Sequence, residues 1–75
     1  MSSPTPTPPE IGSRWQHAKR GTYYTVINHG YFQCSLFEAY DCEPVTIYEA
    51  EDNHSVWVRP TAEFLDGRFI QIALP

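Results

Sequence analysis

Aromatic and basic residues alternate with other side chains in two short stretches of this chain. Trp15, His17 and Lys19 stand two residues apart, and so do Trp57 and Arg59. Successive side chains of a β-strand point to opposite faces, so each set is expected to project from one face of its strand. Indole and guanidinium groups dominate protein interfaces, and together they also suit a stacked ring or a bound anion. The pattern therefore indicates binding.

Seven residues form the predicted binding face. They are Trp15, His17, Lys19, Tyr48, Trp57, Arg59 and Arg68. Two orientations are open for the strand that carries Trp57. If Trp57 faces the core, which is the favoured orientation, Arg59 lies at the end of the fold and pairs with an acid such as Glu63 or Asp66. If the two valines beside Trp57 face the core instead, Trp57 and Arg59 are exposed next to Tyr48.

The spacing of the nucleophilic, basic and acidic residues shows no catalytic pattern. Catalysis needs a nucleophile with a base, paired carboxylates or an activated metal. His17 has no evident partner nearby in the sequence, and a zinc site needs four ligands, usually closely paired. Seven residues separate Cys34 from Cys42, and both cysteines are expected to be reduced thiols. We expect a non-enzymatic protein with no catalytic residue, no metal site and no cofactor.

The charge distribution narrows the class of partner. The net charge is −4, from nine acidic and five basic residues. Acidic residues gather in the middle of the chain at Glu38, Asp41, Glu43 and residues 49–52. Nucleic-acid binding relies on a positive stripe, so it is not expected here. We predict a protein partner, bound through the aromatic and arginine face or through the acidic segment, which would then mimic nucleic acid. The alternative is a small anionic ligand such as a nucleotide signal, with an oligomer pooling its cations.

Five short strands are expected to position these residues. Hydrophobic alternation and β-branched or aromatic content place them at residues 14–19, 22–28, 45–50, 55–60 and 68–74. Pro60 ends the fourth strand, and Thr61 is expected to cap a short helical turn through Phe64. Residues 31–44 are read as an irregular excursion, in which Tyr31 to Ser35 can continue the strand past a bulge at Gly30 and Phe37 to Tyr40 can begin a helical turn.

This order predicts an all-β domain, a small five-stranded barrel like that of the Src-homology-3 (SH3) domain. A helical turn before the last strand is typical of SH3-type barrels, whereas the rival oligonucleotide-binding barrel usually has its helix after strand three. Residues 1–10 are predicted to be a disordered proline-rich tail, and residues 11–75 the single domain. The sequence shows no signal peptide and no membrane span, so a cytoplasmic protein is expected.

Two blocks of sequence resemble a domain-of-unknown-function family of small bacterial and phage proteins. The first block is Gly12-Ser13-Arg14-Trp15-Gln16-His17-Ala18-Lys19, Gly21 and Tyr23-Tyr24-Thr25-Val26. The second is residues 45–48, Val56-Trp57-Val58-Arg59-Pro60, Glu63-Phe64 and Asp66-Gly67-Arg68-Phe69. The resemblance covers residues 12–70 apart from 29–44, and it implies a short β-rich fold encoded by a phage or prophage and acting in the host cytoplasm. It implies no catalytic residue, and counter-defence against the host is one role open to such a protein.

Overall fold

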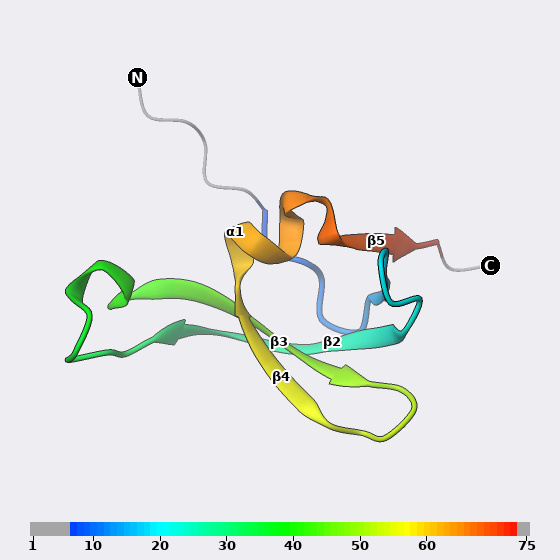
Figure 1. Ribbon diagram of the computed structural model, residues 1–75, viewed down its shortest axis with the longest axis horizontal. Helices are drawn as coiled ribbons and strands as arrows, with labels where there is room; N and C mark the ends of the chain where they lie inside the picture. Colours follow the sequence, from blue (N-terminus) through cyan, green and yellow to red (C-terminus); the bar gives the residue numbers. More distant parts are fainter. Residues whose placement is uncertain (1–6, 74–75) are drawn as a thin grey trace.

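The protein forms one twisted antiparallel sheet with a short helical segment packed on one face (Figure 1). The computed structural model describes residues 7–73, so the predicted disorder of the first six residues lies outside the described part. The strands are β1 (Arg14–His17), β2 (Tyr23–Phe32), β3 (Glu43–Ala50), β4 (Val56–Pro60) and β5 (Phe69–Ile72). The helical elements are η1 (Glu38–Tyr40), α1 (Thr61–Glu63) and η2 (Phe64–Arg68).

The five strands follow the order β4-β3-β2-β1-β5. Each neighbouring pair is antiparallel, and β5 returns across the sheet to pair with β1. The predicted all-β class, five strands and helical turn before the last strand are confirmed. Closure into a barrel is not, because β4 and β5 form the two edges of the sheet and no ladder joins them within residues 7–73.

The core lies between the sheet and the helical segment that connects β4 to β5. Phe64 is fully buried, with its ring stacked on Phe69 at 4.4 Å between centroids and edge-on to Trp15 at 5.0 Å. Tyr24 and Tyr48 add further edge-to-face contacts below these rings. Such pairs stabilise a core beyond the area they bury, which compensates for the small size of the domain.

Two threonines attach the helical segment to the sheet. Thr46 on β3 and Thr61 on α1 are both buried, and their hydroxyl groups lie 3.0 Å apart in a hydrogen bond. The prediction that Thr61 caps the helix is therefore wrong: no side chain caps α1, and the hydroxyl instead satisfies that of Thr46. A buried hydroxyl that lacks a partner is costly, and this pairing removes that cost for both residues.

The β2–β3 hairpin is longer than the sequence indicated. β2 runs straight through Gly30 to Phe32, and the bulge predicted at Gly30 lies instead at Ile27, between the paired residues Val26 and Asn28. Gly30 has an ordinary strand backbone and opposes Val45. The hairpin consequently extends beyond the core and carries its tip away from the helical segment (Figure 1).

Pro9 belongs to the packed structure although it falls within the predicted tail. It is buried, and its carbonyl oxygen contacts the imidazole Nε2 of His29 on β2. Within residues 7–73, each helix falls short of the length and apolar character that a bilayer crossing requires.

Candidate functional site

The predicted binding residues separate into a core residue and a surface group. Trp15 is buried to 8% exposure beneath Phe64, so its ring supports the fold and does not face a ligand. The six others lie toward one end of the sheet, where β1 ends, η2 turns into β5 and β4 passes along the edge. They are His17, Lys19, Tyr48, Trp57, Arg59 and Arg68.

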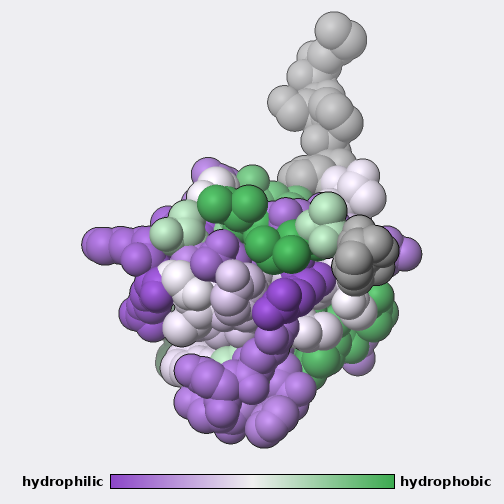
Figure 2. All heavy atoms as spheres, turned by 90° about the vertical axis from the view of Figure 1, so that its right-hand side faces the viewer, coloured by the Kyte–Doolittle hydropathy of each residue, from purple (hydrophilic) through white to green (hydrophobic). Residues whose placement is uncertain are grey.

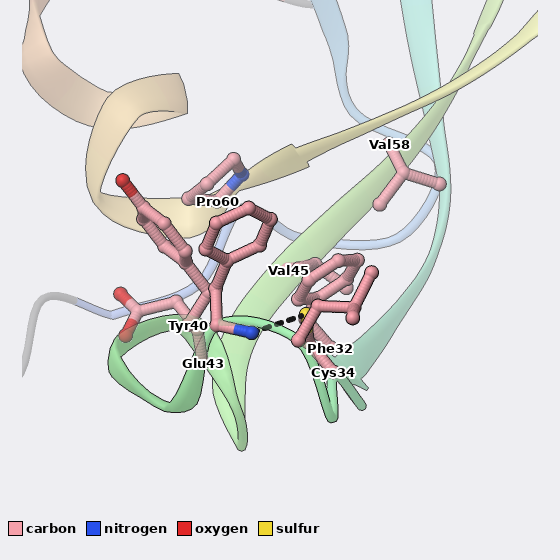
Figure 3. Close-up of a pocket in the computed structure, with 9 residues that line it drawn as sticks. Phe32, Cys34, Tyr40, Glu43, Val45, Val58 and Pro60 are labelled. Atoms are coloured by element: carbon pink, nitrogen blue, oxygen red, sulfur yellow. Dashed lines mark hydrogen bonds between the residues drawn. The ribbon is translucent and has the colours of Figure 1, made fainter.

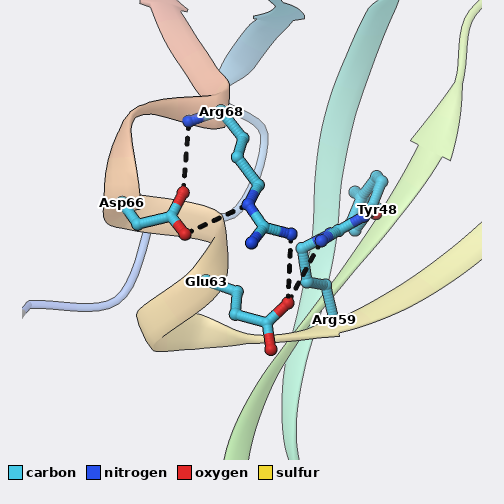
Figure 4. Close-up of polar contacts among 5 residues, drawn as sticks. All are labelled: Tyr48, Arg59, Glu63, Asp66 and Arg68. Carbon is cyan, nitrogen blue, oxygen red and sulfur yellow. Dashed lines mark hydrogen bonds and ion pairs between the residues drawn. The ribbon is translucent and has the colours of Figure 1, made fainter.

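Arg59 and Arg68 share one acid (Figure 4). The Glu63 Oε1 atom accepts from Arg59 Nη1 at 3.2 Å and from Arg68 Nη1 at 3.3 Å. Asp66 binds Arg68 Nε at 3.1 Å, and Arg59 Nε donates to the Tyr48 hydroxyl at 3.4 Å. The hydrogen bond to Tyr48 and the nearby Glu63 carboxylate raise the pKa of Arg59 above its usual value. This network holds the helical segment against β3 and β4.

Trp57 combines the two orientations that the sequence left open. It opposes Tyr48 in the β3–β4 register and so shares the core-facing side of the sheet, yet its side chain is 52% exposed. Val56 and Val58 on the opposite side are each 56% exposed. The cause is the open edge, because the core rings end at β3 and cover neither face of β4. The pairing of Arg59 with Glu63 matches the inward-facing alternative.

His17 is a neutral hydrogen-bonding group within this set of cations. Its ring packs edge-on against Phe69 at 5.1 Å, and its Nδ1 accepts the backbone N–H of Arg20 at 3.1 Å. Burial lowers the pKa of His17 first, and Arg20, Arg59, Arg68 and Lys19 lower it further. An Nδ1 that accepts leaves the hydrogen of the neutral ring on Nε2.

A small hollow, named here the end pocket, opens between these groups. Its volume is about 190 Å³. Aromatic rings from the core form its floor, namely Tyr24, Tyr48 and Phe69. Polar and exposed groups surround it, namely His17, Arg20, Arg59 and Trp57. Lys19 and Arg68 lie on the adjoining surface beside His17, outside the pocket itself.

A larger and strongly apolar groove lies at the tip of the β2–β3 hairpin, in the segment that was predicted to be irregular (Figure 3). Its volume is about 460 Å³. The residues of this hairpin groove come from the tip and from the neighbouring edge of the sheet. They are Phe32, Cys34, Leu36, Phe37, Tyr40, Glu43, Val45, Val58 and Pro60.

Local hydrogen bonds fold the hairpin tip into a defined shape. Asp41 accepts the backbone N–H of Cys34 at 3.0 Å, and the Cys42 N–H donates to the Phe32 carbonyl at 2.7 Å. Phe37 donates its N–H to the Cys34 sulfur at 3.4 Å and packs its ring edge-on against Tyr40 at 6.3 Å. Helical turn η1, Glu38–Tyr40, agrees with the helical turn predicted to begin within Phe37 to Tyr40. These contacts leave the apolar side chains pointing outward.

The exposure of these side chains is the outstanding feature of the surface. Leu36 is 87% exposed and Phe37 62%. Tyr40 and Phe32 are also exposed, and so is Val58 on the adjacent edge strand. Exposed apolar side chains that gather around one groove mark an interaction site, whereas scattered ones carry no such meaning. The sequence does hold a signal for this cluster: five large apolar residues occur within residues 31–40, a segment without strand or helix periodicity to bury them.

The charge around the hairpin groove is entirely negative. No lysine or arginine occurs between Gly21 and Val58, while six acidic residues do. Glu43 lines the groove, and Glu38 and Asp41 lie on the same tip. The end pocket has the opposite character. Seen from the side opposite to the hairpin tip, hydrophilic residues cover much of the surface around a smaller hydrophobic band (Figure 2).

The described residues offer no constellation for metal chemistry. No group of three or more His, Cys, Asp or Glu side chains with metal-binding geometry occurs among residues 7–73. Cys34 and Cys42 are free thiols, as expected from the sequence. Comparison with known proteins finds no matching family model, no significantly similar curated protein and no significantly similar solved structure. The resemblance to a family of small phage and bacterial proteins therefore stays a prediction.

Proposed function

We propose that this protein is a non-enzymatic binding module that holds an amphipathic, basic segment of a partner protein in the hairpin groove. The observation that carries the proposal is the exposed apolar cluster at the hairpin tip. Leu36 and Phe37 are more than half exposed although water disfavours them, and the tip is held in shape by its own hydrogen bonds. A preorganised apolar groove on an extended hairpin suits a protein ligand that buries it on binding.

The charge distribution supports the chemistry of the partner. An apolar groove with acidic residues on its rim complements a segment that has an apolar face bordered by lysine or arginine. Amphipathic helices bind in this way, with anchors at helical spacing in the groove. The acidic character of Glu38, Asp41 and Glu43 repels acidic segments and nucleic acid, which adds specificity.

The hairpin groove replaces the aromatic and arginine face as the proposed site for the protein partner. Arg59 and Arg68 already bind Glu63 and Asp66, so much of their charge is satisfied within the chain. The groove has no such internal partner among the described residues. Of the predicted acidic segment, Glu38, Asp41 and Glu43 lie at the hairpin tip and form the acidic rim of the groove.

Two broader features belong to the same proposal. The order β4-β3-β2-β1-β5 and the helical segment before β5 support an SH3-like architecture in which the barrel is left open. Resemblance to phage and bacterial proteins supports a phage or prophage origin and a host protein, in the host cytoplasm, as the partner.

The test uses two fluorescent helical peptides that share one apolar face and differ only in their polar face, one rich in lysine and the other in glutamate. Fluorescence anisotropy should show saturable binding of the lysine peptide, weakened by salt, and no binding of the glutamate peptide. Leu36→Ser removes an apolar anchor and should lower the affinity about tenfold, the effect of about 1.4 kcal/mol.

The matched control is Ile70→Ser, because Ile70 on β5 is also exposed, at 54%, and lies outside the groove. It should leave the affinity unchanged. Equal binding of both peptides, or an equal loss in the two variants, would overturn the proposal. Sedimentation of the free protein completes the test: a dimer that Leu36→Ser dissociates would assign the groove to a second copy of this chain instead.

A further inference from the structure

The end pocket has a separate chemistry from the hairpin groove. Four of the five basic residues of the chain surround His17. They come from the β1–β2 turn, from β4 and from η2, and they are Lys19, Arg20, Arg59 and Arg68. Two carboxylates, Glu63 and Asp66, oppose them. Two positive charges are left over at this end of a chain whose net charge is −4.

Hydrogen-bond donors remain available in the pocket. Arg59 uses its Nε and Nη1 on Tyr48 and Glu63, while its Nη2 has no hydrogen-bond partner among residues 7–73. His17 accepts with Nδ1 and so presents an N–H at Nε2. The side chain of Arg20 makes no hydrogen bond or ion pair within the same residues, although it lines the pocket. A phosphate group needs several such donors around it.

Trp57 supplies a flat surface beside these donors. Its indole N–H donates to the Ser55 hydroxyl at 2.7 Å, and Ser55 in turn donates to the Asn53 side chain at 2.7 Å. These bonds fix the orientation of a ring that is half exposed. An oriented and accessible indole is a platform on which a heterocyclic base can stack.

We propose that the end pocket binds a nucleoside monophosphate, with the phosphate between His17, Arg20 and Arg59 and the base against Trp57. Arg20 and Arg59 are the cations that line the pocket, and their two positive charges match a phosphate monoester, which carries about −1.5 to −2 at neutral pH. At about 190 Å³ the pocket is smaller than the roughly 300–1,000 Å³ of sites that enclose a whole ligand. It accommodates the phosphate, and the ring stays outside on the indole.

The site does not depend on the hairpin groove, so the two proposals fail separately. The end pocket is lined by residues of β1, β4, β5 and the β1–β2 turn together with the core tyrosines, and it shares no residue with the groove. A phosphate end group of a nucleic acid offers the same chemistry as a free nucleotide. The acidic chain as a whole disfavours the long polyanion, so we assign the pocket to the free nucleotide.

The test is a fluorescence titration with adenosine monophosphate, adenosine and inorganic phosphate. Only Trp57 is exposed of the two tryptophans, so stacking should quench part of the emission. Adenosine monophosphate should bind at least about tenfold more tightly than either fragment, because it makes both kinds of contact. Calorimetry of Trp57→Phe reports whether the nucleotide still binds when the quenching signal is gone.

Arg20→Gln should lower the affinity for adenosine monophosphate about tenfold, the effect of losing one charged hydrogen bond. Lys19→Gln is the matched control, with the same change of charge one residue earlier and a side chain outside the pocket, and it should change the affinity less than about twofold. Three results would overturn the assignment. They are equal binding of phosphate and nucleotide, equal losses in the two variants, and tighter binding of an oligothymidylate than of the mononucleotide.

Discussion

Glu63 competes with an incoming phosphate for Arg59, so neutralising it should strengthen nucleotide binding. Its Oε1 lies 3.2 Å from Arg59 Nη1 and 3.3 Å from Arg68 Nη1. The side chains are partly exposed, 28% for Arg59 and 48% for Glu63. A pair of this kind is worth about 0.2–1 kcal/mol. Glu63→Gln keeps the shape of the side chain and releases that interaction, which predicts a gain in affinity for adenosine monophosphate of about 1.5- to 5-fold.

The titration that follows Trp57 quenching measures this gain. Because the competition is electrostatic, the difference between Glu63→Gln and the unmodified protein should shrink as salt is raised. Asp66→Asn is the near control, since Asp66 binds Arg68, which lies outside the end pocket. Glu51→Gln, which breaks the distant pair with Arg14, is the far control. A folded Glu63→Gln protein with reduced affinity would refute the reasoning, because Glu63 would then position Arg59 and not compete for it.

Three further predictions concern the fold that supports both sites. Phe64→Ala removes a fully buried ring and should destabilise the domain by about 3–5 kcal/mol, enough to unfold much of it, as measured by urea denaturation. Thr46→Val and Thr61→Val should each lower the free energy of unfolding by about 1–3 kcal/mol, because each leaves the other buried hydroxyl without a partner. A double variant no less stable than either single variant would confirm that the two hydroxyls are coupled, whereas additive losses would contradict it. His17 in the folded protein has a pKa below its ordinary value of 6.5, so the unfolded chain takes up the proton first as the pH falls. The stability of the fold should therefore decrease below about pH 6.5, and His17→Gln should remove this decrease. Denaturation midpoints of the unmodified protein and of His17→Gln, taken from pH 5 to pH 8 in steps of about half a unit, measure this loss of stability. Identical pH profiles of the two proteins would contradict the prediction.

Local patterns predicted the strands well because their physical cause is local. Alternation and β-branched content at residues 22–28 and 45–50 correspond to β2 and β3, and Pro60 ends β4 as expected. The bulge at Ile27 was missed, since nothing in the side chain of isoleucine marks a break in pairing. Gly30, three residues later, was predicted to be the bulge because glycine often marks one, although it adopts a normal strand backbone.

Local sequence patterns do not show whether the sheet closes or whether its edge strand is covered. Whether Trp57 is buried depends on how far the core rings extend across the sheet, and this is set by Phe64 and Phe69, which come later in the chain. The core ends at β3, so Trp57 faces inward and is still exposed. Trp15 alternates along its strand with His17 and Lys19, as the residues of one binding face would. Only the position of Phe64 above its ring shows that Trp15 belongs to the core.

The hairpin groove escaped detection for a different reason. Its residues come from an irregular turn and from two strands, so no single periodicity connects Leu36 with Val58. The Cys42 backbone adopts a positive φ of 65°, a conformation rarely chosen by a residue other than glycine, and it helps to close the tip. The end pocket follows more directly from the sequence, because the few cations of an acidic chain stand out, although the predicted binding face does not include Arg20.

The central claim, a protein partner in the hairpin groove, is tested most directly by photo-crosslinking in bacterial cells. A photoreactive benzoylphenylalanine replaces Leu36 in one protein and Ile70 in another, and both positions are exposed apolar sites. We predict a single major adduct from position 36, none from position 70, and a cross-linked partner segment with apolar residues bordered by lysine or arginine. The account is contradicted if position 36 gives no adduct, if both positions give the same one, or if the captured segment is acidic or belongs to a second copy of this chain.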